Sequence, residues 1–479
     1  MSRPNILIFM TDQHQAATLD PGHPCRTPNA ARMRAEGMRF PRAYTPTALC
    51  APARASLMTS LYPHRHGMLN NPHVPQAIRR GLAGNFPHFS ERLKAAGYRM
   101  SYCGSWGVSK EKSPRDHGWE EPDAATQKAL WRWPPDKVPA GKGYRLKRPG
   151  YAPYLLYGTP DCGPDGFSEH AWTRFAIDRM AELAKGLTPW CLYVGLHGPH
   201  DPYVAPAEFV RLYDPAKVPK PASFHDPMTD KPSVYRRHRF EVWGELEWEH
   251  YAAATAHYWA YVTFIDDLFG QVLAALDATG QAGNTLVLFT SDHGEMMGGH
   301  GLLFKGIPAF EECYRVPMLA RLPGLVPAGS VCDEFVSLLD VGPTLIELAG
   351  ARPLEECHGR SAVRLLHGGN PSDWPQEFMG QFHGTELLYS QRILTTRKHK
   401  YVFNGFDFDE LYDLEADPHE MRNLYFSSAH RHVLEDMIRR LWRRALAVGD
   451  TISCHAYPTT DLVPLGPGDL PGPGGPGRS

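Results

Sequence analysis

Residues 6–13 read ILIFMTDQ, an apolar run that ends abruptly in a threonine, an aspartate and an amide. Short, largely apolar runs recur at residues 98–103, 190–196 and 285–290, and each is followed by polar or small residues. Runs of this length are typical of strands buried on both faces, as in a parallel sheet covered by helices. In such sheets ligands bind at the carboxyl ends of the strands. The residues that follow these runs are therefore the first place to expect a functional site.

Helical patterns lie between the runs. The helices expected are 169–183, with Ser168 as a possible N-cap, 250–276, and 336–348. Strands that alternate with helices predict an α/β fold with a large mixed, mostly parallel sheet sandwiched by helices. Later in the chain the pattern changes. Short strands at 397–403 and 410–414 and a helix at 427–447 indicate a smaller C-terminal α+β subdomain.

These patterns predict a division of the chain into one large and one small unit. We expect a catalytic domain over residues 1–368 and an α+β subdomain over 369–463, followed by a Pro- and Gly-rich tail at 464–479. Two long excursions in the first domain, 110–165 and 203–248, show no regular period. Long irregular segments of this kind are often functional, so we expect them to form the rim of a pocket.

Composition excludes several classes of protein. Of 479 residues, 42% are hydrophobic, 21% are charged and the net charge is -2, which indicates a globular chain without a global field for nucleic acid or an acidic membrane. No apolar window approaches the ~20 residues of a membrane span, and the N-terminal apolar run is too short for a secretory signal. The nine cysteines form no CxxC pair. We therefore expect a cytoplasmic protein with no membrane or nucleic-acid partner and no dense disulfide framework.

Cys50-x-Pro52-x-Arg54 is the most suggestive short motif. Pro52 suits the first turn of a helix, which would place Cys50 at the helix N-terminus, where free N–H groups favour an anion or a nucleophile. Arg54 could reach back to a tetrahedral oxyanion. The alternative is a buried structural cysteine followed by an ordinary helix.

Asp12-Gln13 and Asp292-His293 each follow an apolar run. Two carboxylates, an amide oxygen and an imidazole form a mostly oxygen donor set that suits one divalent cation. An aspartate after a strand can instead serve only as a helix N-cap, which is the alternative for either one alone.

His197 and His200 lie in a proline-rich loop after the run at 190–196, and Lys305 follows Asp292 by thirteen residues. One histidine could protonate a leaving group, and Lys305 could return over the cation to stabilise an oxyanion. The alternatives are loop histidines bonded to the backbone and a surface lysine. Trp131, Trp133, Trp243 and Trp248 could form a platform for a sugar or an aromatic ring, or simply pack.

These motifs occur together in an order that resembles the type I, formylglycine-dependent sulfatase family of the alkaline-phosphatase-like superfamily. The matching segments are 4–7 with Asp12, 27–29 with Glu36 and Gly37, 50–59, 284–285 with 291–294, 340–344, and 410–418 with Asn423 and Leu424. The resemblance covers most of the chain and implies the alkaline-phosphatase-like fold and hydrolysis of a small-molecule sulfate ester.

The resemblance also implies roles for individual residues. A formylglycine-generating maturase would oxidise Cys50 to formylglycine, whose hydrate is the nucleophile. One divalent cation, Ca²⁺ by family default with Mn²⁺ or Mg²⁺ as alternatives, would bind Asp12, Gln13, Asp292, His293 and the residue at position 50. Arg54 and Lys305 would stabilise the developing charge, His200 would assist the leaving alkoxide, and His197 would contact the substrate.

One departure from the family concerns the anion pocket. Many sulfatases have Gly-Lys-x-His where this chain has Gly104-Ser105-Trp106-Gly107. A lysine and a histidine that would contact the bound anion are therefore missing. Ser105 stands at the position of the lysine and is a candidate substrate contact. Lys110, from the next loop, could supply a positive charge in their place.

Gln13, His293 and Asn71 resemble the branch that holds choline sulfatases and phosphonate monoester hydrolases, in which Asn71 would be a substrate-contacting amide. The alternative for Asn71 is a turn residue. Sulfate ester hydrolysis is the first hypothesis, and phosphonate monoester or phosphodiester hydrolysis by the same site is the second. The third is an inactive, anion-binding family member. A homo-oligomer is possible.

Overall fold

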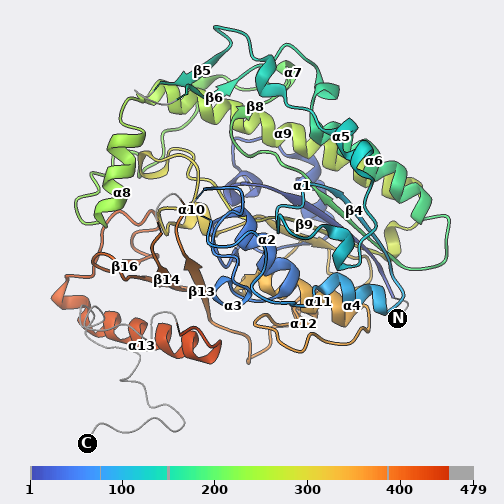
Figure 1. Ribbon diagram of the computed structural model, residues 1–479. Coiled ribbons are helices and arrows are strands. Elements are labelled where there is room, and N and C mark those ends of the chain that lie inside the picture. Colours follow the sequence, from blue (N-terminus) through green and yellow to red (C-terminus); the bar gives the residue numbers. More distant parts are fainter. Residues whose placement is uncertain (1–2, 76, 148–151, 386–387, 452–479) are drawn as a thin grey trace, which may run out of the picture.

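A computed structural model describes residues 3–75, 77–147, 152–385 and 388–451, and its centre is a seven-stranded sheet (Figure 1). In spatial order the strands are β11 (Ser330–Val331), β2 (Met38–Arg39), β10 (Met318–Arg321), β9 (Thr285–Ser291), β1 (Asn5–Thr11), β7 (Trp190–Gly195) and β4 (Arg99–Gly104). β10 runs antiparallel to both of its neighbours, whereas the other pairings are parallel. The carboxyl ends of β1, β7 and β9 therefore lie at one edge.

Helices cover both faces of the sheet, and β1 shows why. Ile6, Ile8 and Met10 pack into one buried cluster while Leu7 and Phe9 pack into another, because successive side chains of a strand point to opposite faces. One layer contains α2 (Cys50–Thr59), α4 (Phe89–Ala95) and α11 (Val341–Leu348). The other contains α1 (Pro28–Glu36), α6 (Ser168–Leu183) and α9 (Trp248–Ala278). The sequence-based prediction of the fold class is confirmed.

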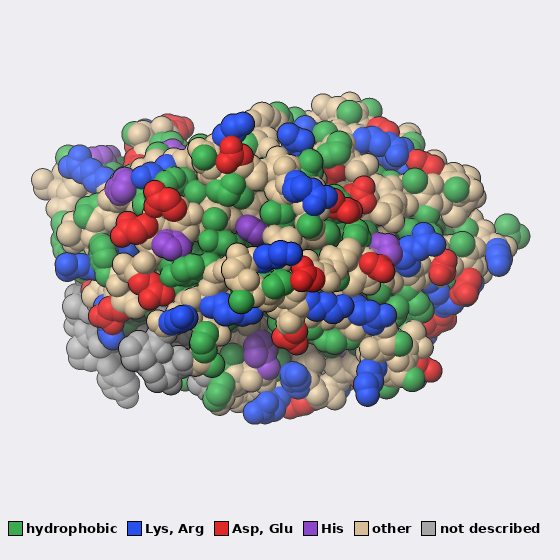
Figure 2. Space-filling model, turned by 90° about the horizontal axis from the view of Figure 1, so that it is seen from above, with side chains coloured by type: hydrophobic (Ala, Val, Ile, Leu, Met, Phe, Trp, Pro, Cys, Tyr) green, Lys and Arg blue, Asp and Glu red, His purple; other side chains and the backbone are tan. Residues whose placement is uncertain are grey.

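The two excursions come together above α9. Strands β5 (Gly143–Leu146) and β6 (Tyr154–Gly158) of the first join β8 (Tyr203–Val204) of the second in a three-stranded sheet (Figure 1). Short helices accompany them: α5 (Ala124–Leu130), α7 (Ala207–Val210), α8 (Ser233–Arg237) and a π-helical turn at His238–Val242. On the face seen in Figure 2, basic and acidic side chains are interspersed.

The C-terminal region forms a separate antiparallel sheet. Its strands are β13 (Glu377–Phe382), β14 (Gln391–Thr396), β15 (His399–Asn404) and β16 (Glu410–Asp413). Helix α13 (Arg431–Ala447) packs on this sheet through a buried cluster that includes Leu394, Leu441 and Trp442. The remaining short elements are β3 (Ala43–Tyr44) paired with β12 (Val336–Ser337), α3 (Pro63–His66), α10 (Glu311–Tyr314) and α12 (Val363–Leu366). The predicted tail at 464–479 lies outside the described residues.

Two local expectations are wrong. The segment 336–348 is not one helix: Val336 and Ser337 form β12, and α11 begins only at Val341. Asp340 accepts the backbone N–H of Ser337, which favours a turn between the two. Ser168 is the first residue of α6 rather than its N-cap, because its hydroxyl bonds the backbone of Arg132. Among the described helices, none is long and apolar enough to cross a membrane.

Candidate active site

Asp12, Asp292, His293 and Cys50 meet at the carboxyl edge of the central sheet. The first three follow β1 and β9, and Cys50 is the first residue of α2. One ligating atom from each lies within 4.8 Å of the others. Cys50 Sγ is 3.2 Å from His293 Nε2 and 3.7 Å from Asp12 Oδ1. Cys50 is partly exposed whereas the other three are buried, so it forms the open side of the cluster.

Arg54 holds the two carboxylates in place. Its Nη2 donates to Asp12 Oδ2 at 2.9 Å, its Nε donates to Asp292 Oδ2 at 2.8 Å, and its Nη1 donates to the carbonyl oxygen of Ser105 at 3.0 Å. The side chain is buried. Burial by itself would raise the pKa of Asp12, but Arg54, His200 and His293 hold it well below its usual range. Both carboxylate groups are thus fixed with Oδ1 turned toward the cluster.

The donor set fits a divalent cation. His293 Nδ1 lies 3.0 Å from the carbonyl oxygen of Gly294, and because a carbonyl only accepts, the proton is on Nδ1 and Nε2 keeps its lone pair. Burial lowers the pKa of His293, which also favours the neutral imidazole. The two carboxylates match the oxygen ligands that Ca²⁺ and Mn²⁺ take in proteins, and the neutral imidazole is a ligand typical of transition-metal ions.

Gln13 approaches this cluster with its amide in a fixed orientation. Its Nε2 donates to Glu295 and its Oε1 accepts from Lys305. Its backbone has φ +64°, in the left-handed region that a glutamine rarely adopts, and its N–H donates to Asp292 Oδ1 at 3.1 Å. Such strain persists where surrounding contacts impose it and is common at functional sites.

Lys305 and His200 lie beside Gln13. Lys305 Nζ is 2.6 Å from His200 Nε2 and 3.7 Å from Asp201 Oδ1. His200 Nδ1 lies 2.7 Å from the carbonyl oxygen of Asp201, so Nδ1 carries a proton and Nε2 accepts from the ammonium of Lys305. Burial would raise the pKa of Asp201, but His200 and Lys305 lower it to about 2. His200, predicted to assist the leaving group, and Lys305, predicted to stabilise an oxyanion, therefore form one hydrogen-bonded unit.

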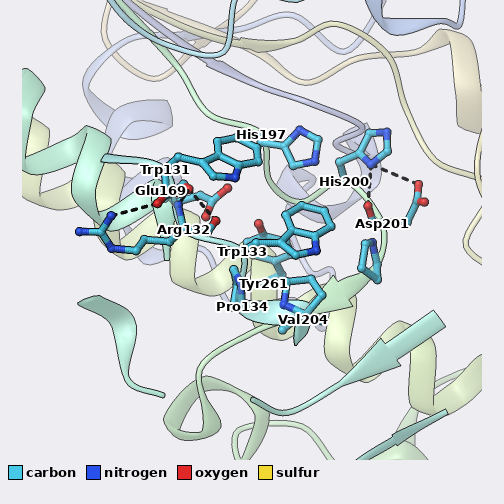
Figure 3. Close-up of a pocket in the computed structure, with 13 residues that line it drawn as sticks. Trp131, Arg132, Trp133, Pro134, Glu169, His197, His200, Asp201, Val204 and Tyr261 are labelled. Carbon is cyan, nitrogen blue, oxygen red and sulfur yellow. Dashed lines mark hydrogen bonds and ion pairs between the residues drawn. The ribbon is translucent and has the colours of Figure 1, made fainter. Parts of the chain in front are cut away.

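His197 lies on the other side of His200, in a recess that Figure 3 shows. The two imidazoles stack at 4.8 Å, and Trp133 lies 6.3 Å from His197 and 6.1 Å from Trp131. The recess has a volume of only about 20 Å³. It can hold little more than a water molecule, which needs about 10–15 Å³ of such space.

The other expected substrate contacts surround Cys50 at different distances. Asn71 lies beside it, with Oδ1 accepting from the N–H of Ala51 at 3.0 Å, so the amide helps to fix the start of α2. Ser105 offers its carbonyl oxygen to Arg54. Lys110 is exposed and lies outside the cluster of described contacts around Cys50. The substrate-contacting roles of Asn71, Ser105 and Lys110 stay predictions.

The sequence matches a known protein family. Residues 4–351 match the family model described as Sulfatase, which is more than half of the chain. The chain belongs to the sulfatase family. A second model, N-sulphoglucosamine sulphohydrolase, C-terminal, matches residues 298–446 of this sulfatase.

Relatives span nearly the whole sulfatase chain. It is 29% identical to the multifunctional alkaline phosphatase superfamily protein PehA of Trinickia caryophylli, over 95% of this chain and 98% of that protein. It is 30% identical to the choline-sulfatase of Rhizobium meliloti, over 88% and 82% respectively. Among solved structures, the phosphonate monoester hydrolase SpPMH of Silicibacter pomeroyi superposes with a TM-score of 0.79 at 24% identity, covering 94% of this chain and 97% of that one.

Sequence reasoning missed three residues that shape the site of this sulfatase: Glu295, Asp201 and Phe304. Glu295 is fully buried and fixes the Gln13 amide, and burial raises its pKa to about 7. Asp201 bridges His200 and Lys305. Glu295 lies two residues after His293, and Asp201 lies directly after His200. Their closeness to expected site residues could have revealed them. Phe304 directly precedes Lys305, so the same signal was available for it.

Proposed function

We propose that this sulfatase hydrolyses sulfate monoesters of small molecules, with position 50 supplying the nucleophile after Cys50 is oxidised to formylglycine. The observation that carries the proposal is the position of Cys50: at the N-terminus of α2, on the open side of a buried set of two carboxylates and an imidazole. Burial, followed by the charges of Asp12 and Asp292, raises the pKa of the Cys50 thiol.

This chemistry needs a divalent cation and a modified residue at position 50. Asp12, Asp292, His293 and Gln13 would hold the cation, Ca²⁺ in our proposal, which would supply Lewis acidity. Formylglycine at position 50 would supply, as its hydrate, one hydroxyl as the nucleophile and a second that allows the sulfate to be released. A serine or cysteine at position 50 has no second hydroxyl and would remain esterified.

Lys305 stabilises the negative charge of the transition state, and His200 assists the leaving alkoxide. The Lys305 ammonium, held between Gln13 and His200, faces the site and stabilises negative charge that develops on the ester oxygens. Burial would lower the pKa of Lys305, but the surrounding Cys50, Asp201 and Asp12 raise it, so the group is cationic at neutral pH. His200 assists the departing alkoxide from this position, while Lys305 donates a hydrogen bond to its Nε2 and keeps its own proton.

A second candidate function is hydrolysis of phosphonate monoesters or phosphodiesters by the same residues. Ser105 and Gly107 stand where many sulfatases have a lysine and a histidine, and the phosphonate monoester and phosphodiester hydrolases that the chain resembles also lack this pair.

A matched substrate panel tests the proposal. Protein produced with the maturase and loaded with Ca²⁺ is assayed on phenyl sulfate and on phenyl methylphosphonate, and we expect kcat/KM to favour the sulfate at least tenfold. Preference for the phosphonate would select the second function, and turnover of neither would select the inactive, anion-binding alternative. Cys50→Ser is the control, with one turnover at most. Cytoplasmic location, the maturase and a homo-oligomer stay predictions.

A further inference from the structure

The first excursion of this sulfatase contacts the loop that carries His200 through one strand. Strand β6 pairs in parallel with β8, and Tyr157 lies opposite Tyr203. Tyr154 precedes Tyr157 on β6 and Asp201 precedes Tyr203 in the chain, so the same register brings Tyr154 close to Asp201. The Tyr154 hydroxyl donates a hydrogen bond to Asp201 Oδ2. The excursion is therefore connected to the His200 loop by a side chain as well as by backbone pairing.

The two oxygens of the Asp201 carboxylate have different surroundings. Oδ2 accepts from Tyr154, whereas Oδ1 faces His200 Nδ1 at 3.4 Å and Lys305 Nζ at 3.7 Å (Figure 3 shows His200 and Asp201). Among the residues that the structure describes, none donates a hydrogen bond to Oδ1. An ammonium and a carboxylate in direct contact are about 2.7–2.9 Å apart, so the pair at 3.7 Å is a loose one. The Asp201 carboxylate thus stops short of a direct contact with Lys305.

This separation leaves the Lys305 ammonium with its two partners in the site. Lys305 Nζ donates to Gln13 Oε1 and to His200 Nε2. If the Asp201 carboxylate were free to turn, one of its oxygens could close on the ammonium and draw it away from both. The Tyr154 hydroxyl opposes that turn because it holds Oδ2.

Packing keeps the Tyr154 hydroxyl in place as a donor. Its ring lies edge-on to Phe304, with 5.9 Å between the ring centroids, and Phe304 directly precedes Lys305. Burial, followed by the charge of Asp201, raises the pKa of Tyr154, so the hydroxyl keeps its proton and can donate. A phenylalanine at position 154 would keep the ring contact and remove only the hydrogen bond.

We propose that Tyr154 is a positioning residue, which holds Oδ2 of Asp201 and thereby keeps Lys305 and His200 aligned for the reaction. The inference rests on the proposed hydrolysis and adds a role for the first excursion. Tyr154 acts through Asp201 and does not need to touch the ester. Loss of its hydroxyl therefore affects both charge stabilisation by Lys305 and departure of the alkoxide, which His200 assists.

The test compares two esters of similar shape whose leaving groups differ. Nitrophenolate is a stable anion that departs with little assistance, whereas phenolate depends on His200. In the aldehyde-bearing, Ca²⁺-loaded enzyme, Tyr154→Phe should lower kcat/KM about thirtyfold for phenyl sulfate and about threefold for 4-nitrophenyl sulfate, so that the nitrophenyl-to-phenyl ratio rises about tenfold. A merely structural role would lower both rates equally. Tyr157→Phe, on the same strand with its ring against Tyr144 and His257, is the matched control and should keep the wild-type ratio.

A double-mutant cycle tests whether Tyr154 acts through Asp201. Asp201→Ala alone should raise the nitrophenyl-to-phenyl ratio, which also keeps the proposal testable if Tyr154→Phe does not fold. Adding Tyr154→Phe to Asp201→Ala should change the ratio less than about twofold, because the carboxylate that the hydroxyl orients is gone. Independent effects of the two substitutions would contradict the proposal. An unchanged ratio in Tyr154→Phe or in Asp201→Ala would also contradict it.

Failure of the proposed function is distinguishable from failure of this inference. If the wild type hydrolyses only phosphonates, phenyl and 4-nitrophenyl methylphosphonate replace the sulfates, and Tyr154→Phe should change their ratio in the same direction. If it hydrolyses neither class, a crystal structure of Tyr154→Phe decides. We then expect Lys305 Nζ within about 3 Å of an Asp201 carboxylate oxygen and out of hydrogen-bond distance of His200 Nε2. An unchanged contact between Lys305 and His200 in that variant would overturn the proposal.

Discussion

Gln13 and Glu295 share a hydrogen bond that fixes which end of the Gln13 amide faces Lys305 and the expected cation. Glu295 Oε2 can only accept when ionised, so Gln13 Nε2 points to it and Oε1 points away. Glu295 Oε1 is occupied by the N–H groups of Met297 and Phe304, at 3.0 and 2.6 Å. One buried carboxylate thus orients a candidate cation ligand and shapes the loop that carries Lys305.

Glu295→Gln should weaken cation binding without unfolding the protein. The new amide oxygen can keep the bonds from Met297 and Phe304, but its NH₂ would face the NH₂ of Gln13 and turn that side chain around. We expect the dissociation constant for Ca²⁺, measured by calorimetry, to rise about 10–100-fold, as for other residues that orient metal ligands. Glu415→Gln, the same change at an exposed site, is the control. Wild-type affinity in Glu295→Gln would show that the Gln13 orientation does not matter.

At this scale the sequence predicted the residues that follow strands and missed those that depend on packing. Asp12, Asp292 and His293 were found because parallel strands bring their carboxyl ends to one edge. Arg54 was expected to face an oxyanion, whereas its described hydrogen bonds go to Asp12, Asp292 and the Ser105 carbonyl. That difference could not be read from the spacing, since it depends on how α2 lies across β1 and β9.

Among the elements, α1 is anchored by a carboxylate on another helix. Asp266 of α9 accepts the backbone N–H groups of Asn29 and Ala30, at 2.9 and 2.8 Å, in the first turn of α1. These are N–H groups that a helix leaves without internal partners. Burial raises the pKa of Asp266 to about 6, although these hydrogen bonds act in the opposite direction.

This pKa predicts a pH dependence of stability. Ionisation of Asp266 costs more in the folded state than in the unfolded chain, where the pKa is near 3.8. The stability of the wild type relative to Asp266→Asn should therefore be greatest below pH 4 and decline by about 3 kcal/mol as the pH rises to 7. Urea unfolding across this range measures it, and Asp277→Asn, an exposed position on the same helix, controls for surface charge. A difference that stays constant with pH would contradict the assignment.

Helices and strands with a long hydrophobic pattern were predicted correctly, whereas a strand of only two residues was missed. The helix expected at 250–276 is α9, Trp248–Ala278, and the strand expected at 285–290 is β9, Thr285–Ser291. The two residues of β12 pair only with Ala43 and Tyr44, almost three hundred residues earlier in the chain. No local pattern indicates such a contact, so the predicted helix at 336–348 included the two residues of β12.

For the whole molecule, a buried ionic cluster connects the C-terminal sheet to the loop after Lys305. Lys400 of β15 is buried and its Nζ contacts Glu311 at 2.7 Å, Glu420 at 2.8 Å and the Ala309 carbonyl at 3.1 Å. The second family model begins at residue 298, ahead of the boundary expected at 368, and so includes both sides of this connection. The C-terminal strands thereby support the segment that follows Lys305.

Lys400→Met should destabilise the whole protein. It leaves the buried Glu420 and the partly buried Glu311 without their cation, and loss of one partner of a buried ion pair typically costs about 3–5 kcal/mol in the free energy of unfolding. Urea denaturation at pH 7 measures the loss, and Lys398→Met, two residues earlier and half exposed, is the control. A loss below about 1 kcal/mol would show that the cluster is not a structural connection.

The measurement that tests the central claim most directly is the mass of the tryptic peptide 43–54, which carries Cys50, paired with the turnover of phenyl sulfate by the same sample. Conversion of the cysteine to formylglycine lowers the peptide mass by about 18 Da. Across preparations with different extents of conversion, we predict that turnover rises in proportion to the converted fraction and extrapolates to zero. Full turnover by protein that retains the thiol at position 50 would contradict the account.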